Sequence, residues 1–169
     1  MQKIILSLPF LIMMTTISAQ ESDLKTTTYF LIRHAEKVRS DAKNLNPDLD
    51  ERGIQRAQKW KDIFQFIDFQ YIYSTNFTRT IKTVEPIALE KNIEISMYHP
   101  TKIDFELFKN KTLGKNILIV GHSNSIPQFV NVLINQEKYK EVDDTEFSHL
   151  YIITIKGNQI SDHLLYIDF

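Results

Sequence analysis

The sequence predicts one α/β domain, with a mostly parallel central sheet, helices on both faces and an antiparallel hairpin at the C-terminal edge. Two patterns predict this fold class. Short apolar segments rich in β-branched residues alternate with segments of helical periodicity along most of the chain. The last two apolar segments flank Lys156-Gly157-Asn158, which is a hairpin signal. A length of 169 residues suits a single domain, which we place at residues 26–169.

The expected strands are short, apolar and bounded by turn-forming residues. Asn116–Gly121 is a continuous apolar run, as in strands that are covered on both faces. In chain order, the expected strands are Thr26–Arg33, Tyr71–Ser74, Ile93–Tyr98, Asn116–Gly121, Leu150–Ile155 and Gln159–Ile167.

Helices are expected between these strands. Asp50 is placed to cap the first helix. After it, apolar residues recur at helical spacing and predict one buried face: Ala57, Trp60, Phe64 and Ile67. The later helices are expected at Thr78–Lys91, Lys102–Lys111 and Ser125–Ile134.

The composition excludes several classes of protein. There is no cysteine, which excludes a disulfide scaffold, a cysteine nucleophile and thiolate metal sites. The 20 basic and 21 acidic side chains give a formal net charge of -1, without the basic excess of most nucleic-acid binders. Four glycines are too few for a glycine-rich nucleotide loop, and no His-Glu-x-x-His motif is present. We therefore expect no nucleic-acid partner, no cofactor and no bound metal.

The first 20 residues differ from the rest of the chain. Lys3 precedes an apolar run from Ile4 to Met14, and small and polar residues follow it as far as Ala19. This order is typical of a secretory signal peptide, and the run is too short to span a bilayer. We expect residues 1–19 to be a signal peptide. The remaining chain would then be exported, periplasmic or secreted, without stable membrane association. A retained N-terminal anchor is the alternative.

Three short segments carry residues suited to chemistry. Arg33 and His34 end the first expected strand, Arg79 follows the second, and Gly121-His122 ends the fourth. In open α/β sheets, ligands bind outside the carboxyl ends of the strands. Arginine forks match phosphate oxygens, and a neutral imidazole nitrogen can attack phosphorus. The residues therefore indicate a phosphate site with a histidine nucleophile.

These segments, in this order, resemble the histidine phosphatase superfamily, in its phosphoglycerate mutase-like branch. Arg33-His34 matches the Arg-His of the family, and Gly121-His122 matches its later Gly-His. The segment Ser74–Thr80 looks like the serine-to-arginine-threonine segment of the family. The resemblance implies the α/β fold and a small phosphorylated substrate.

The resemblance also implies roles for the catalytic residues. His34 would be the phosphorylated nucleophile, and Arg33 and Arg79 would hold the phosphate. His122 would be the second imidazole of the phosphate pocket. Ser123 and Asn124 are expected either to donate hydrogen bonds to substrate oxygens or to cap the helix at Ser125.

The general acid is not assigned. The resemblance implies a carboxyl group of raised pKa that protonates the leaving oxygen, and in the mutase-like branch it is a glutamate between the second arginine and the second histidine. Asp104 and Glu106 fall in that interval, although a charged helix face would look the same. The other branch places an acid directly after the second histidine, where this chain has Ser123. Glu36 is expected at the mouth of the pocket or exposed.

The expected function is hydrolysis of a phosphomonoester through a phosphohistidine, without metal, by an exported protein. The alternative is a member of the same fold that binds phosphate ligands and is catalytically weak or inactive. Substrate specificity is expected to depend on the loops Val38–Asp48 and His99–Phe108. Three histidines without a matching motif are interpreted as structural or surface groups: His99, His149 and His163.

Overall fold

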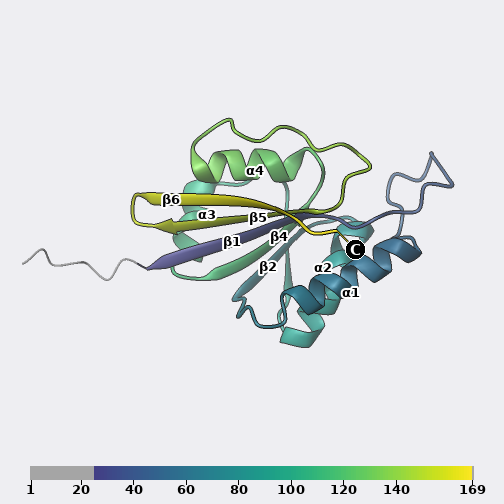
Figure 1. The fold of residues 1–169 in the computed structure, drawn as a ribbon, viewed down its shortest axis with the longest axis horizontal. Helices are drawn as coiled ribbons and strands as arrows, with labels where there is room; N and C mark the ends of the chain where they lie inside the picture. The colour runs from purple at the N-terminus through teal and green to yellow at the C-terminus, as the bar shows by residue number, and fades with distance from the viewer. Residues whose placement is uncertain (1–24, 169) are drawn as a thin grey trace, which may run out of the picture.

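A computed structural model of the chain describes residues 25–168. The expected signal peptide, residues 1–19, lies outside the described residues. Strands and helices alternate along the described chain, with a helix after each of the first four strands (Figure 1). In chain order the elements are β1 (Thr26–Arg33), α1 (Glu51–Ile63), β2 (Tyr71–Thr75), α2 (Thr78–Lys91), β3 (Ile95–Tyr98), α3 (Phe105–Thr112), β4 (Asn116–Gly121), α4 (Ser125–Ile134), β5 (His149–Lys156) and β6 (Gln159–Tyr166).

The strands form one sheet of order β3-β2-β4-β1-β5-β6. β1, β2, β3 and β4 run parallel, whereas β5 pairs antiparallel with β1 and β6 antiparallel with β5. This arrangement confirms the predicted fold class, including the C-terminal hairpin. Gly157 in the hairpin turn has a φ of 59°, a left-handed conformation that glycine adopts at little cost.

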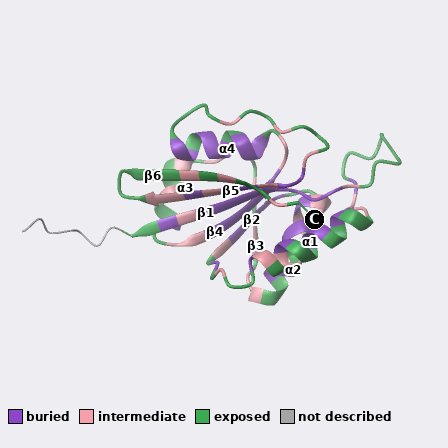
Figure 2. Ribbon diagram, in the orientation of Figure 1, coloured by how far each residue is buried: buried purple, intermediate pink, exposed green. Residues whose placement is uncertain are grey.

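The alternation of side chains along the central strands divides the core between the two faces of the sheet. Tyr29 and Leu31 of β1 pack on one face with α4 and α3, around Phe129. Phe30 and Ile32 pack on the other face with α1 and α2, around Trp60 and Phe64. Figure 1 shows these helix pairs on opposite sides of the sheet, and Figure 2 shows that much of the central strands and of α4 is buried.

Two elements begin two or more residues later than the sequence predicts, each for a local reason. β3 begins two residues later than expected, because α2 ends at Asn92 in a left-handed conformation and the amide of Ile93 donates back to the Ala88 carbonyl. α3 begins three residues later, because the Asp104 carboxylate accepts from the Leu107 amide and caps the helix there.

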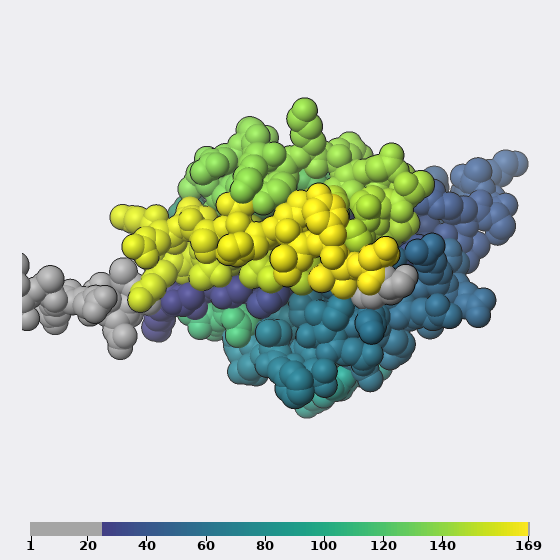
Figure 3. Space-filling view, viewed as in Figure 1, coloured from purple at the N-terminus to yellow at the C-terminus, as the bar shows by residue number. Residues whose placement is uncertain are grey.

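The outer strand β6 covers part of the surface between the two helical layers. The space-filling view shows it as a band between the α4 side and the α1 side (Figure 3). The segment between β1 and α1 projects at one end of the sheet, where the carboxyl ends of β1, β2 and β4 lie (Figure 1). Within residues 25–168, no helix has the length and apolar character needed to cross a bilayer.

Candidate active site

The parallel register brings the two predicted histidines together at the carboxyl ends of β1 and β4. Arg33 is paired with Gly121, and the His34 amide donates to the Gly121 carbonyl at 2.9 Å. His34 and His122 therefore leave adjacent strands at the same level, and their ring centroids are 5.5 Å apart. An added Cβ on Gly121 would lie 2.7 Å from the Tyr98 hydroxyl and 2.9 Å from Ser125 Oγ, so this close packing requires glycine.

Hydrogen bonding fixes the tautomer of His34. Its Nδ1 lies 2.7 Å from the Ala35 carbonyl oxygen, which can only accept, so Nδ1 carries the hydrogen and Nε2 the lone pair. The side chain is buried. Burial, together with the charges of Arg33 and Arg79, lowers the pKa of His34 to about 3. His34 is therefore neutral near pH 7 and presents a free lone pair, as a nucleophile requires.

The guanidinium of Arg33 is buried against a turn that follows α4. Its NH1 donates to the carbonyls of Asp143 and Glu146, both at 2.8 Å. Its Cζ lies 4.3 Å from the centre of the Phe147 ring. Its Nε is buried and has no hydrogen-bond partner among the described residues. Arg33 is thus held through NH1, and its Nε–H has no acceptor among the described residues.

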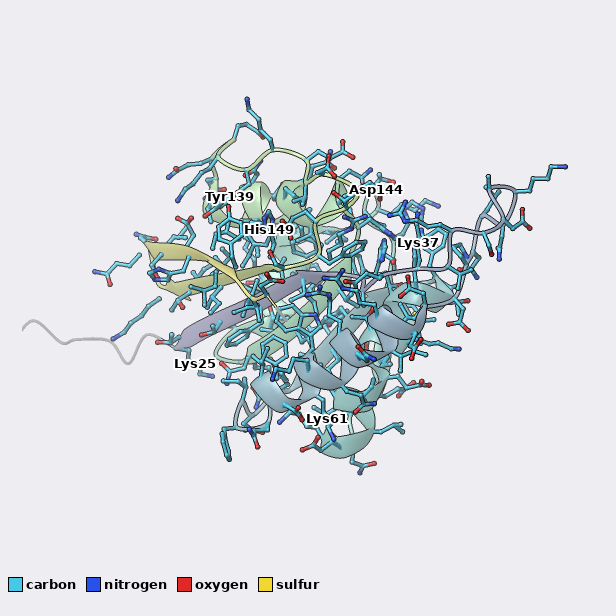
Figure 4. The ribbon with its side chains drawn as sticks, turned by 45° about the vertical axis from the view of Figure 1, so that its right-hand side comes forward. Lys25, Lys37, Lys61, Tyr139, Asp144 and His149 are labelled. Atoms are coloured by element: carbon cyan, nitrogen blue, oxygen red, sulfur yellow. The ribbon has the colours of Figure 1, made fainter. Side chains whose placement is uncertain are left out.

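Asp144 on the same turn is bound by two arginines. Its carboxylate accepts from Arg33 NH2 and from Arg39 NH1, each at 2.5 Å. Hydrogen bonding by Arg39, with the charge of Arg33, lowers the pKa of Asp144 to about 2. Asp144 lies at the end of the molecule that also carries Lys37 (Figure 4). Nothing in the sequence pattern indicated Asp144 as a site residue.

Arg79 and Phe77 extend the site from the start of α2. Arg79 NH2 lies 3.5 Å from His122 Nδ1, and its Cζ lies 4.5 Å from the Phe77 ring centre. The Phe77 ring meets the His122 ring edge to face, with centroids 5.0 Å apart. Arg79 Nε is also buried without a hydrogen-bond partner in the described part of the chain. The two predicted clamp arginines therefore both retain a buried N–H donor.

A chain of hydroxyl groups orients His122. The Thr75 hydroxyl donates to Thr80 Oγ1, so it accepts from His122 Nε2 at 2.9 Å. Nε2 therefore carries the hydrogen of neutral His122, and its Nδ1 lone pair faces Arg79. Burial, followed by the charges of Arg79 and Arg33, lowers the pKa of His122 to about 4. Both histidines are uncharged near neutral pH.

Glu36 has a structural role that differs from both sequence expectations. It is buried, and its carboxylate accepts three hydrogen bonds from Arg56 of α1 at 2.8–3.0 Å. Although burial opposes it, the bonds from Arg56 hold the pKa of Glu36 below its ordinary value. Gly53 packs so tightly here that an added Cβ would lie 2.0 Å from the Glu36 carbonyl oxygen. α1 thus supports the segment that carries His34.

A cavity of about 690 Å³ opens beside His122. Neutral polar, apolar and aromatic residues form it, with no Asp, Glu, Lys or Arg among them. The lining residues are Thr75, Asn76, Phe77, Met97, Tyr98, His99, Pro100, Thr101, His122, Asn124, Ser125 and Gln128. A hollow of about 840 Å³ on the exposed side of α1 contains neither histidine of the site.

The structure separates the two substrate-binding predictions. Asn124 lines the cavity, and its side chain makes no capping bond to α4. Ser123 does not line it, and its carbonyl accepts from the Val142 amide at 3.0 Å. The hydroxyl that accepts from the His122 amide belongs to Ser125.

Neither candidate acid lies in this site. Asp104 is exposed and caps α3, and Glu106 is exposed and paired with Lys109. Neither lines the cavity beside His122.

Sequence analysis left His99 and Lys37 without a role, yet both lie at the site. His99 lines the cavity, and the charge of Lys37 acts on His122. Within residues 25–168, no three His, Asp or Glu side chains cluster in a way that could hold a metal ion.

Comparison with known proteins relates this geometry to a family. Residues 29–99 match the family described as histidine phosphatase superfamily (branch 1). No curated protein matches the chain in sequence. Those 71 residues include Arg33, His34 and Arg79.

Solved structures with the same fold cover most of the chain. The protein histidine phosphatase SixA complexed with tungstate has a TM-score of 0.66 at 13% identity, covering 82% of this chain and 96% of SixA. Phosphoglycerate mutase from Bacillus anthracis has a TM-score of 0.64 at 16% identity, covering 86% and 95%. A mutant phosphoserine phosphatase from Entamoeba histolytica, in complex with phosphoserine, has a TM-score of 0.61 at 16% identity, covering 80% and 94%.

The family match begins in β1 and ends after β3, and the shared fold extends over the remaining strands. Residues 29–99 are thus similar to the histidine phosphatase superfamily, and most of the chain shares its fold with the solved structures.

Proposed function

We propose that the protein is a phosphatase that hydrolyses a phosphomonoester through a phosphohistidine on His34, without a metal ion. The single observation that carries this proposal is the state of His34. It is buried and neutral, its Nδ1 hydrogen is given to the Ala35 carbonyl, and its Nε2 lone pair is free beside two arginines. A histidine in this state is a nucleophile, whereas a structural histidine would have both nitrogens engaged.

Two displacement steps account for the reaction. His34 Nε2 attacks phosphorus, the P–N bond forms, and the P–O bond to the leaving group breaks with its electron pair on oxygen. Water then attacks the phosphohistidine, a P–O bond forms, and the P–N pair returns to Nε2. The proton of that water passes to solvent or phosphate. His34 thus ends as it began.

The arginines stabilise the charge that spreads over the phosphoryl oxygens in both steps. Arg33 and Arg79 each keep a buried Nε–H for which the described residues offer no acceptor, and phosphate oxygens would provide one. The two hydrogen bonds from NH1 fix the position of the Arg33 guanidinium before substrate binds. Little reorganisation is then needed when the phosphate arrives.

The carboxylates that bind the site arginine and support the nucleophile segment are ionised near neutral pH. The pKa of Asp144 is held at about 2, and the pKa of Glu36 is lowered beneath Arg56. This observation favours a second candidate function, a phosphate-binding protein with weak or no turnover, because neither of these carboxyl groups carries a proton that it could give to the leaving oxygen.

The test is hydrolysis of p-nitrophenyl phosphate in excess chelator by the wild type, by His34→Ala and by His163→Ala. His163 lies on β6 and is exposed, so its replacement controls for the loss of an imidazole. We expect turnover to fall more than about 1,000-fold in His34→Ala alone. Turnover that survives there would disprove the nucleophile. Phosphate binding without turnover by the wild type would establish the second candidate.

Export is a separate part of the proposal and rests on residues 1–19 alone. The order of Lys3, an apolar run and Ala19 supports it. Expression of the full chain, followed by cell fractionation and N-terminal sequencing, tests it. A protein in the exported fraction that begins near Gln20 would support export, and an uncut protein in the cytoplasm would contradict it.

A further inference from the structure

The cavity beside His122 lies next to the proposed phosphate position. Phe77 lies between them, because its ring contacts the Arg79 guanidinium and also lines the cavity. Its ring also meets the His122 ring at 5.0 Å. A group esterified to a phosphate held by Arg79 would therefore enter the cavity along the Phe77 ring.

The lining of the cavity contains no Asp, Glu, Lys or Arg. Its apolar and aromatic members are Phe77, Met97, Tyr98 and Pro100. The Tyr98 hydroxyl donates to the Val120 carbonyl, so the ring and not the polar group is offered to a ligand. Its polar members are amides, hydroxyls and the imidazoles of His99 and His122. A charged group placed here would lose water and would meet no Asp, Glu, Lys or Arg side chain in the lining.

The surrounding carboxylates add a second constraint. Asp144 is engaged by Arg33 and Arg39, and Glu36 by Arg56. Neither they nor Asp104 and Glu106 line the cavity. No Asp or Glu lines the cavity, so a leaving oxygen there has no carboxyl group to protonate it, and we expect it to depart as an anion that takes its proton from water. Phenolate departs far more readily than an alkoxide, because phenols are more acidic than alcohols.

We propose that this cavity receives the leaving group of the substrate and selects phosphomonoesters of uncharged phenols. The inference rests on the phosphatase activity proposed above and names its substrate class. His34 Nε2 displaces the phenolate from phosphorus, the electron pair of the P–O bond stays on the phenol oxygen, and water protonates it. Aromatic rings also pack well against Phe77 and Tyr98.

Three small esters test the two parts of the proposal by comparison of kcat/KM. 4-Carboxyphenyl phosphate adds one charge to phenyl phosphate, and cyclohexyl phosphate keeps the neutral body but changes the leaving group to an alcohol. We expect phenyl phosphate to exceed the carboxyphenyl ester by at least about tenfold. This order opposes intrinsic reactivity, because the carboxyphenol is the better leaving group. We expect the cyclohexyl ester to be slower by at least about 100-fold.

A charge introduced into the cavity should reverse the first preference. Gln128 is exposed, lies on α4 and lines the cavity, so Gln128→Lys places an ammonium group there. Gln136→Lys adds the same charge beyond the end of α4, outside the lining. The ratio of phenyl to carboxyphenyl kcat/KM should fall at least about tenfold in the first variant and stay constant in the second.

The outcomes separate this inference from the proposed function. If none of the three esters is hydrolysed, or if hydrolysis does not need His34, the proposed function fails and the substrate class with it. If turnover depends on His34 but the three esters react alike, only the substrate class is overturned. An unchanged ratio in Gln128→Lys, with phenyl phosphate still hydrolysed, also overturns it.

Discussion

Two arginine–carboxylate pairs flank His34, the proposed nucleophile, and they differ in burial. In the pair of Glu36 with Arg56, the side chains are 10% and 4% exposed and share three hydrogen bonds. In the pair of Arg33 with Asp144, the arginine is 3% exposed but the aspartate is 55% exposed. The first pair is closed to water and supports the fold. In the second, water reaches the carboxylate, so a phosphate oxygen can compete with it for Arg33.

The largest effect is expected from breaking the buried pair. Arg56→Met leaves the Glu36 carboxylate buried without its main partner, which should cost about 3–5 kcal/mol of unfolding free energy. Urea denaturation measures it. Arg52→Met is the matched control, because Arg52 is 67% exposed and lies 3.3 Å from the same carboxylate. Its loss should cost less than about 1 kcal/mol. Equal losses of unfolding free energy in the two variants would contradict the distinction between a buried supporting arginine and an exposed one.

Acid should affect the two arginine–carboxylate pairs and His34 differently. Below pH 6.5 an unfolded His34 takes up a proton, whereas the folded side chain, with a pKa of about 3, stays neutral. The contribution of neutral His34 to the free energy of unfolding is therefore fully present above pH 6.5 and is lost as the pH falls below it. At pH 5 the loss from His34 is about 2 kcal/mol. The carboxylates of both pairs have lowered pKa values and remain ionised there.

Thermal or urea unfolding of the wild type and His34→Asn at pH 7 and pH 5 measures this contribution. The variant should lose less stability than the wild type over that range, by about 2 kcal/mol. Identical pH dependence in the two proteins would show that His34 titrates normally in the folded state.

The smallest effect is expected from the exposed carboxylate. Asp144→Asn removes the negative charge beside Arg33, while the carbonyls of Asp143 and Glu146 still hold the guanidinium. Competitive inhibition by inorganic phosphate should strengthen by about threefold to tenfold, with little change in stability. Glu141→Gln is the control, because it removes the same charge from an exposed position on the same segment. Weaker inhibition in Asp144→Asn would mean that the carboxylate assists phosphate binding.

The sequence predicted those parts of the molecule whose signal is local. β1, β4 and α4 lie where apolar runs and turn residues placed them, and α1 begins after Asp50 as expected. The strand-end rule also brought His34 and His122 to one edge of the sheet, because parallel neighbours end together. The closeness of His34 and His122 at that edge follows from the order and direction of β1 and β4 in the sheet.

What the sequence did not predict depends on contacts between distant segments. Arg33 and Asp144 are 111 residues apart, and Asp144 lies in a turn without periodicity. Glu36 was left open because its partner, Arg56, lies on a helix whose rotation the pattern defines only roughly. Asp104 and Glu106 had a suitable place in the chain, but α3 turns them to solvent. Side-chain partners of this kind are set by the tertiary fold and do not follow from local sequence patterns.

The amide of His34 donates to Gly121 and so continues the β1–β4 ladder by one residue. The proposed nucleophile is therefore anchored by the sheet backbone and not by a loop. Its amide should exchange with deuterated water only when the sheet opens, far more slowly than the amides of the exposed segment 39–46. A phosphoryl group on His34 would accordingly be held by a long-lived part of the native state. Variation in the neighbouring loops can then change what enters the site without disturbing the atom that reacts.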